Sequence, residues 1–147
     1  MITDRLDALA TALKRLPGAL TAATVNVVTD NAYILELDNQ QQLEAGLDAD
    51  GRTIEPAYTF ATVRIKEEKG QESQHVTLRD RGDFYRGIVA RVRGEAIEVV
   101  GTDKKTQALQ EKYGEAIIGL SEEAIDAFRE DYVRPELEYQ TRHLLGL

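Results

Sequence analysis

The segment VTLRDRGDFYRGIVARVRGEAIEVV, residues 76–100, decides the predicted fold because it holds the clearest strand pattern and the clearest turn residues of the chain. Within it, Ile88, Ala90 and Val92 alternate with Val89, Arg91 and Arg93. After Gly94, residues 96–100 resume a composition rich in β-branched side chains. Such runs on either side of a glycine are typical of a β-hairpin. The sequence therefore predicts a hairpin that turns near Arg93, Gly94 and Glu95.

A tight corner is predicted directly before the hairpin, at residues 78–85. Asp80 suits turns and helix caps, and Gly82 tolerates a positive φ that other residues resist. Two aromatic residues, Phe84 and Tyr85, follow at once. We expect their rings to fill a hydrophobic core beneath the corner.

The N-terminal 46 residues are predicted to be helical. Ile2, Leu6, Leu9, Leu13 and Leu16 recur at spacings of four and three, which places them on one stripe of a helix over 2–16. Pro17 and Gly18 are expected to end that helix. A second helix is predicted over about 22–46, although the β-branched run at 24–28 would also suit a strand.

The remaining segments alternate between loops and short helices. Residues 58–69 suit either a short helix or an extended arm, and residues 104–113 suit a helix closed by Gly114. Ser121 is a good N-cap for a last helix over 122–145, with two glutamates in its first turn. Pro135 should kink or split that helix near 131–134, because its ring removes one backbone hydrogen bond.

These elements predict an α+β fold in which an antiparallel sheet, built on the central hairpin, is flanked by N-terminal and C-terminal helices. A chain of 147 residues fits a single domain, 1–147. We divide it into a helical region (1–46), a loop and arm (47–75), the hairpin core (76–101) and C-terminal helices (102–147).

Composition excludes several classes of function. The chain has no cysteine, so thiolate metal sites and cysteine nucleophiles are excluded and a cytosolic origin is expected. No apolar run approaches the roughly 18 residues of a membrane span, and no signal peptide is recognised, so no membrane partner is expected. The net charge of -8 opposes binding to nucleic acid.

The charge is unevenly distributed along the chain. Residues 64–93 carry eight bases and five acids, a local net of +3, whereas residues 121–147 carry seven acids and three bases, a local net of -4. Two faces of opposite sign could meet across a subunit boundary, and ordinary solvated faces would give the same pattern.

No constellation of catalytic or metal-binding residues is recognised. Asp48, Asp50 and Gly51 resemble a calcium loop only superficially, because position 57, where a glutamate ligand would stand, is alanine. His75 and His143 are the only histidines and stand 68 positions apart, so no metal site is expected there. No serine lies in a nucleophile elbow, and the glycines are too scattered to cradle phosphate. We expect neither enzymatic activity nor a metal or cofactor.

Four short motifs occur in an order that resembles the phage virion morphogenesis family, the Mu-type tail or head completion proteins. The likeness covers residues 42–147. The motifs are QLEAGLDADGRTIEP (42–56), TFATVRIKEEKG (59–70), Leu78-Arg79-Asp80-Arg81-Gly82-Asp83-Phe84 before the hairpin, and Ile118-Gly119-Leu120-Ser121-Glu122-Glu123 before an acidic helix. Arg81 replaces the usual threonine, and Ile54 stands where an aromatic residue is common.

The resemblance implies a structural virion protein, a head-tail connector, neck or tail-completion subunit that forms a ring around the DNA channel. It implies no catalytic residues. Its expected partners are further copies of itself and other neck, portal, adaptor or tail proteins, in the virion and, during assembly, in the host cytoplasm. An acidic protein that does not grip DNA suits a conduit through which DNA slides.

Two charged sets are the predicted subunit contacts, because rings close through two different patches of the same subunit. The basic set is Arg64, Lys66, Arg79, Arg81 and Arg86, and the acidic set is Glu122, Glu123, Asp126 and Glu130. The alternative interpretation is an acidic protein-binding module, immunity-like or antitoxin-like, with no virion role. A hydrolase whose site is assembled from scattered residues is a third.

Overall fold

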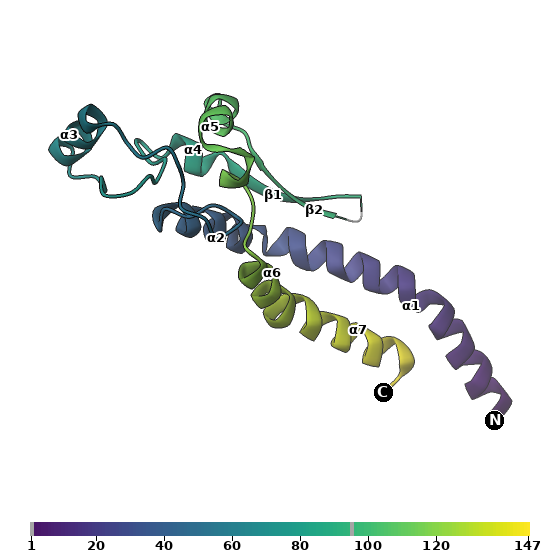
Figure 1. Ribbon diagram of the computed structural model, residues 1–147. Coiled ribbons are helices and arrows are strands. Elements are labelled where there is room, and N and C mark those ends of the chain that lie inside the picture. Colours follow the sequence, from purple (N-terminus) through teal and green to yellow (C-terminus); the bar gives the residue numbers. More distant parts are fainter. Residues whose placement is uncertain (1, 95) are drawn as a thin grey trace. The chain divides into compact units, whose positions relative to one another are not determined.

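The protein has the α+β fold that the sequence predicts (Figure 1). The computed structural model describes residues 2–94 and 96–147. In chain order the elements are α1 (Ile2–Asp30), α2 (Ala32–Glu44), α3 (Phe60–Glu68), α4 (Asp83–Arg86), β1 (Ile88–Arg93), β2 (Ala96–Gly101), α5 (Thr106–Tyr113), the 3-10 turn η1 (Glu115–Ile117), α6 (Glu122–Phe128), the π-helical turn η2 (Arg129–Val133) and α7 (Arg134–Leu145).

The predicted hairpin is confirmed. β1 and β2 pair antiparallel, in a register that runs from Ile88 opposite Gly101 to Arg93 opposite Ala96. Arg91 lies opposite Glu98, and their side chains form an ion pair at 3.1 Å. Gly94 begins the turn with φ +63°, whereas Glu95, the other residue of the predicted turn, lies outside the described residues.

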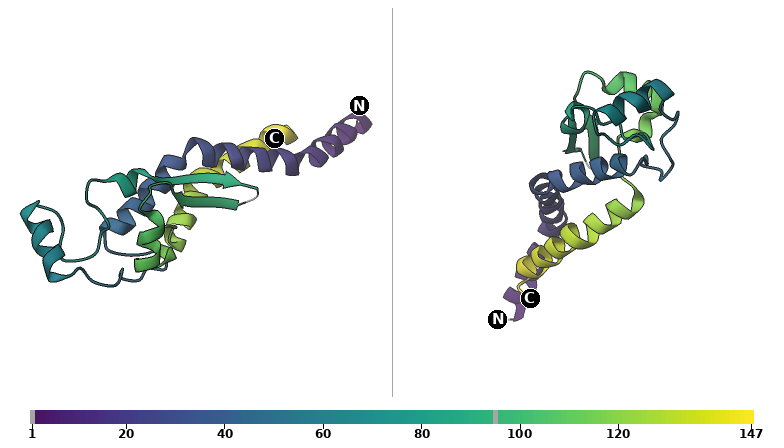
Figure 2. Two further views of the ribbon diagram at one scale, coloured as in Figure 1. Left: turned by 90° about the horizontal axis from the view of Figure 1, so that it is seen from above. Right: turned by 90° about the vertical axis from the view of Figure 1, so that its left-hand side faces the viewer.

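Residue contacts divide the chain into two compact units. The first joins Met1–Asn31 to Asp126–Leu147, and the second is Ala32–Ile125. The first unit is helical, with α7 lying along α1 (Figures 1 and 2). The second unit holds the hairpin, the corner and the shorter helices. None of the described helices is both long and apolar enough to cross a membrane.

The prediction that the first helix ends at Pro17 and Gly18 is wrong. α1 continues through both residues to Asp30. A proline removes one backbone hydrogen bond and strains the turn before it, but Ala23, Val27 and Val28 are buried in this unit, where α1 packs against α7 and η2. Packing of an apolar face commonly decides helix formation over local propensity.

The prediction that residues of about 22–46 are helical is confirmed, but they do not form one separate helix, because α1 runs to Asp30 and the chain breaks at Asn31. The Asn31 side-chain amide and its backbone N–H both donate to the carbonyl oxygen of Val27, at 2.8 and 3.1 Å. α2 then starts afresh at Ala32 and belongs to the second unit. The β-branched run at 24–28 is helical, because two of its valines are buried there.

The interruption expected around Pro135 is present. The last helix is split into α6 and α7 by the π-helical turn η2. In that turn the Arg134 N–H donates to the carbonyl oxygen of Arg129, five residues back. Pro135 therefore stands in the first turn of α7, where a missing N–H costs little. Phe128 and Tyr132 stack across the turn with ring centroids 5.2 Å apart.

The second unit is built around one apolar cluster beneath the hairpin and the corner. Its buried members are Leu43, Ile54, Val76, Phe84, Tyr85, Ile88 and Ile117. A buried amide ties α2 to the segment after η1, because Asn39 donates to the Ile117 carbonyl oxygen at 3.1 Å and accepts from the Gly119 N–H at 2.9 Å. α2 is thereby held across the core from residues nearly eighty positions away.

The local caps agree with the sequence. Ser121 Oγ accepts from the Ala124 N–H at 3.2 Å and starts α6. Gly114 ends α5 with φ +97°. Residues 60–68, for which a short helix and an extended arm were both open, form the helix α3, which Thr59 caps by accepting from the Thr62 N–H.

Candidate interaction surface

The corner is formed by a left-handed glycine that starts a single helical turn. Gly82 has φ +90° and precedes α4. A Cβ at this position would lie 2.9 Å from Arg86 Nη1, the end of an exposed side chain that can move, so the backbone conformation is what favours glycine. The turn drives Phe84 and Tyr85 into the core, where each is 4 % exposed. Asp83, at the start of the turn, pairs with Arg86 at the surface.

Two tyrosines hold the strand-like segment that leads into the corner. The Tyr85 hydroxyl donates to the Thr77 carbonyl oxygen at 2.6 Å, and burial raises the pKa of this phenol, so it remains a donor. The Tyr58 hydroxyl accepts from the N–H groups of Thr77 and Leu78, both at 3.0 Å. Leu78 has φ +59°, a strained conformation for leucine, and these hydrogen bonds help to fix it.

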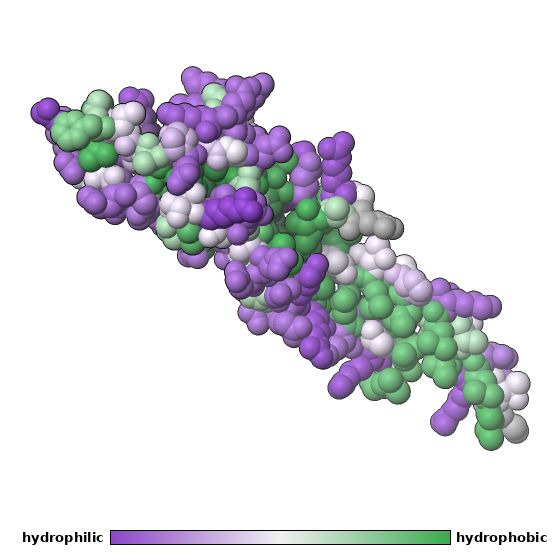
Figure 3. Space-filling view, in the orientation of Figure 1, coloured by the Kyte–Doolittle hydropathy of each residue, from purple (hydrophilic) through white to green (hydrophobic). Residues whose placement is uncertain are grey.

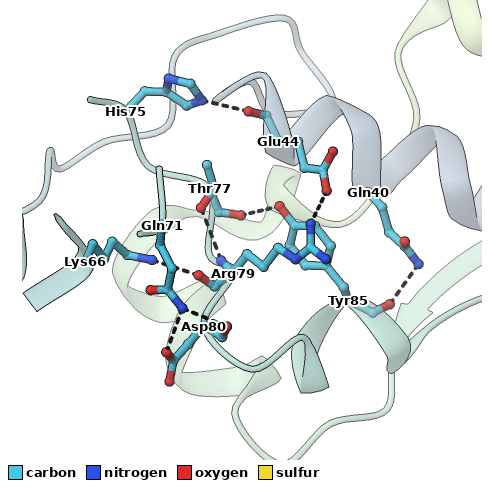
Figure 4. A network of polar contacts seen from close by, with 9 residues as sticks. All are labelled: Gln40, Glu44, Lys66, Gln71, His75, Thr77, Arg79, Asp80 and Tyr85. Carbon is cyan, nitrogen blue, oxygen red and sulfur yellow. Dashed lines mark hydrogen bonds and ion pairs between the residues drawn. The ribbon is translucent and has the colours of Figure 1, made fainter. Parts of the chain in front are cut away.

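Three members of the basic set have partners within the chain. Lys66 is 7 % exposed, and its ammonium donates to the Arg79 carbonyl oxygen at 2.7 Å and lies 5.0 Å from the Tyr58 ring centroid (Figure 4). Arg79 pairs with Glu44 at 2.7 Å and lies over the Tyr85 ring (Figure 4). Arg86 pairs with Asp83. Of the three, Lys66 is buried and committed to its contact, whereas the pairs of Arg79 and Arg86 are exposed, and such pairs are weak.

Arg64 and Arg81 differ from the other three. Both side chains are exposed, and neither forms an ion pair with any residue in 2–94 or 96–147. Arg64 belongs to α3 and Arg81 to the corner loop. They are the two members of the basic set that form no ion pair within the described residues.

Asp80 is held by the end of α3 and the loop after it. Its carboxylate accepts from Lys69 Nζ at 2.9 Å. Its carbonyl oxygen accepts from Gln71 Nε2 at 3.0 Å (Figure 4). The hydrogen bonds from Lys69 and Gln71 lower the pKa of Asp80 below its usual value. Asp80 is thus a positioning residue for the loop and not a partner for an incoming base.

The acidic set divides in the same way. Glu122 and Glu123 are exposed and form no ion pair among the described residues. Asp126 pairs with Arg129 at 3.5 Å, and Glu130 pairs with Arg134 at 3.0 Å, both along one helical face. Such exposed pairs are weak, so these acids can exchange partners.

An apolar stripe on the first part of α1, the seam, is exposed in the described residues. Ile2, Leu6, Leu9 and Leu13 are 78 %, 60 %, 41 % and 51 % exposed. The same spacing continues through Leu16 and Leu20 to Ala23 and Val27, which are buried. Figure 3 shows the hydrophobic residues gathered over α1 and α7. An exposed apolar stripe of this kind marks a protein interaction site.

Sequence reasoning missed the internal engagement of the corner. Neither Glu44 nor Tyr58 stands at a spacing that connects it to residues 77–79, because loops of different length bring them together. The burial of Lys66 cannot be predicted from the sequence alone. Lys66 lies on the inner face of a short helix and is followed by the exposed residues Glu67 and Glu68. The sequence predicts that the seam residues form one stripe of a helix, but it does not predict that this stripe is exposed.

The residues considered for metal binding have structural partners. Asp48 Oδ1 accepts from the N–H groups of Asp50 and Arg52, at 2.9 and 3.0 Å, in an ordinary turn. His75 Nε2 lies 2.6 Å from the Glu44 carbonyl oxygen. Across residues 2–94 and 96–147, no three histidine or acidic side chains are grouped so that they could hold a metal ion.

Substitution of Lys66 by methionine is expected to lower the free energy of unfolding by about 1 to 3 kcal/mol, because it leaves the Arg79 carbonyl oxygen without its charged donor. Lys69→Met is the matched control: the lost pair with Asp80 is exposed, so the cost should stay below about 1 kcal/mol. Urea denaturation measures both. Equal effects would show that Lys66 is no more important to the corner than a surface lysine.

The stability contributed by Asp80 is expected to depend on pH. Because its folded pKa is lowered, the contribution is present above the ordinary aspartate pKa of about 3.9 and is lost as the pH falls through the folded value. The stability difference between the wild type and Asp80→Asn should therefore shrink between pH 6 and pH 3. A difference that stays constant over this range would contradict the role given to the Lys69 and Gln71 hydrogen bonds.

The chain matches no protein-family model, and no curated protein and no solved structure is significantly similar to it.

Proposed function

We propose that this protein is a structural subunit of a tailed-phage or prophage virion, a head-tail connector, neck or tail-completion protein that assembles into a ring around the DNA channel. The observation that carries the assembly role is the exposed apolar seam of α1, since a protein that acts alone gains nothing from four large aliphatic side chains in water. The resemblance of residues 42–147 to the phage virion morphogenesis family supports the place of that assembly.

Exposed charged side chains of the second unit also support the proposal. Four exposed charged residues form no ion pair in the described part of the chain. They are the bases Arg64 and Arg81 and the acids Glu122 and Glu123. Two patches of opposite sign on one subunit suit the head-to-tail contacts that close rings. The buried Lys66 ties α3, which carries Arg64, to the loop that carries Arg81.

Loss of particle joining tests the proposed role. In the phage or prophage that encodes this chain, deletion of its gene should leave filled heads and separate tails, and the wild-type gene supplied in trans should restore joined particles. Electron microscopy of lysates distinguishes the outcomes. Normal particles from the deletion strain would sink the virion role and leave the alternative, an acidic module that binds one basic target protein.

A further inference from the structure

A small pocket in the second unit is lined by the corner loop, residues 78–84, and by one face of α5. Its volume is about 180 Å³. Leu109 and Tyr113 line it from α5, four residues apart, and Lys105 precedes them by the same interval. The ring of Tyr58 adds a further apolar surface to the wall. Aromatic and aliphatic side chains therefore meet basic ones in one hollow.

The pocket contains a buried base without a counterion. Lys66 is 7 % exposed, and among residues 2–94 and 96–147 it forms no ion pair. An ammonium has three N–H donors, but the described residues give Nζ one hydrogen bond, to the Arg79 carbonyl oxygen (Figure 4). The Tyr58 ring adds only a cation–π contact. Because a buried charge is normally paired, an anion from outside the chain would supply the partner that Lys66 lacks.

The acids in the lining of the pocket do not fill this need, because each already pairs with another base. One of the four lining bases is paired as well. These pairs are Asp80 with Lys69, Asp83 with Arg86, and Arg79 with Glu44.

Two further bases at the pocket are unpaired. Arg81 and Lys105 are exposed, and in the part of the chain that the structure describes neither forms an ion pair. Together with Lys66 they leave three positive charges without a counterion around one hollow. Charges of one sign in a hollow with apolar walls concentrate the field there, so the pocket attracts an anion.

Size and wall chemistry limit which anion fits. Pockets for drug-sized ligands have about 300 to 1,000 Å³, whereas this one has about 180 Å³. At about 30 Å³ of liquid volume per water molecule, that is the room of roughly six waters. A nucleotide is too large. The apolar side chains Tyr58, Leu109 and Tyr113 match a ligand with a hydrocarbon part, which inorganic phosphate lacks.

We propose that this pocket binds one carboxylate carried on a short hydrocarbon chain, supplied by a glutamate side chain of a partner protein or by a free organic acid. Lys66 donates to the carboxylate, and Arg81 and Lys105 attract it to the pocket. The inference goes beyond the proposed virion role and does not depend on it, because binding to the purified chain and particle joining are scored in separate experiments.

Butyrate, a carboxylate on a three-carbon chain, is the first probe. In amide NMR spectra of the isotope-labelled full-length protein, butyrate should shift the signals of Gly82 and Leu109 saturably, with a Kd in the millimolar range. Butyramide has nearly the same shape without the charge, so it should bind at least about tenfold more weakly. Inorganic phosphate should also bind more weakly than butyrate. Equal shifts with butyramide, or no saturable shift with butyrate, would overturn the proposal.

Substitutions test which bases hold the anion. Lys66→Met should weaken butyrate binding at least about tenfold, and a folded variant with unchanged affinity would overturn the proposal. If that variant is unfolded, the joint change Arg81→Gln and Lys105→Gln decides, since both side chains are exposed. It should weaken binding about three- to tenfold. Arg64→Gln with Lys104→Gln removes the same charge outside the pocket lining, and an equal loss there would also overturn the site.

A blocked tripeptide with a central glutamate distinguishes the two sources of the carboxylate. The same tripeptide with a central glutamine is its control. If the glutamate peptide shifts the pocket signals and the glutamine peptide does not, a partner's side chain can reach the site. If butyrate binds and neither peptide does, the site takes a free organic acid. Failure of butyrate and of both peptides would leave no carboxylate site, whatever the result of particle joining.

Discussion

Phe84→Ala is expected to lower the free energy of unfolding of the second unit by about 3 to 5 kcal/mol. The ring is 4 % exposed and belongs to the apolar cluster beneath the corner. Its removal leaves a cavity that the neighbouring Tyr85 cannot fill, because the Tyr85 hydroxyl is bound to the Thr77 carbonyl oxygen. Denaturation in urea, followed by far-ultraviolet circular dichroism, gives the change.

Phe60→Ala is the matched control for that substitution. Phe60 is the first residue of α3 and is 80 % exposed, so its removal should change the stability by less than about 0.5 kcal/mol. A near-neutral result for Phe84→Ala as well would mean that the corner does not anchor the core. In that case the two aromatic residues would have to be explained by binding.

Joint reversal of Arg64 and Arg81 to glutamate is expected to lower the yield of joined particles on the order of a hundredfold, because like charges across an interface cost several kcal/mol. Both side chains are exposed and lack ion pairs in residues 2–94 and 96–147, so stability should be unchanged. Arg79 is unsuitable for this test, because its pair with Glu44 and its contact with the Tyr85 ring make it part of the corner.

Two variants make the charge-reversal result specific. Arg52 and Arg142 are also exposed, and within the described residues neither forms an ion pair, so their joint reversal controls for net charge. If the basic and acidic sets meet between subunits, adding Glu122→Arg and Glu123→Arg should restore joining to the reversed protein. Unchanged joining after the Arg64 and Arg81 reversals would exclude the basic set from the subunit contact.

The central part of the fold follows from the sequence, because its signals are local. Alternation at 88–93 and the glycine at 94 specify the hairpin, and Gly82 with the aromatic pair after it specifies the corner. Ser121 and Pro135 locate the start of α6 and the interruption before α7. In each case the residues that determine the conformation are neighbours in the chain.

The errors arise where tertiary packing overrides a local signal. Pro17 would end an isolated helix, but burial of Val27 and Val28 keeps α1 continuous to Asp30. The break at Asn31 has no strong sequence pattern, and the Asn31 backbone N–H still donates to the Val27 carbonyl oxygen as in a continuous helix. Likewise, charge counting treats Lys66 as a surface cation, because its acceptor, the Arg79 carbonyl oxygen, lies 13 residues away.

The candidate interaction surface was only partly predictable for the same reason. A run of basic residues indicates a basic region, but it does not tell which side chains already have partners within the fold. The structure reduces the basic set to Arg64 and Arg81, and it adds the exposed seam of α1 as a second surface. The first set carries charge and the second apolar area, so the two surfaces can be tested independently.

Quantitative mass spectrometry of purified particles tests the virion role most directly. Intact, DNA-filled particles are separated from free protein by density and size, and the copies of this chain per particle are counted against the major capsid protein. A ring-forming connector predicts a small, constant copy number that remains after washing in high salt. Absence of the chain from particles that are otherwise complete and infectious would contradict it.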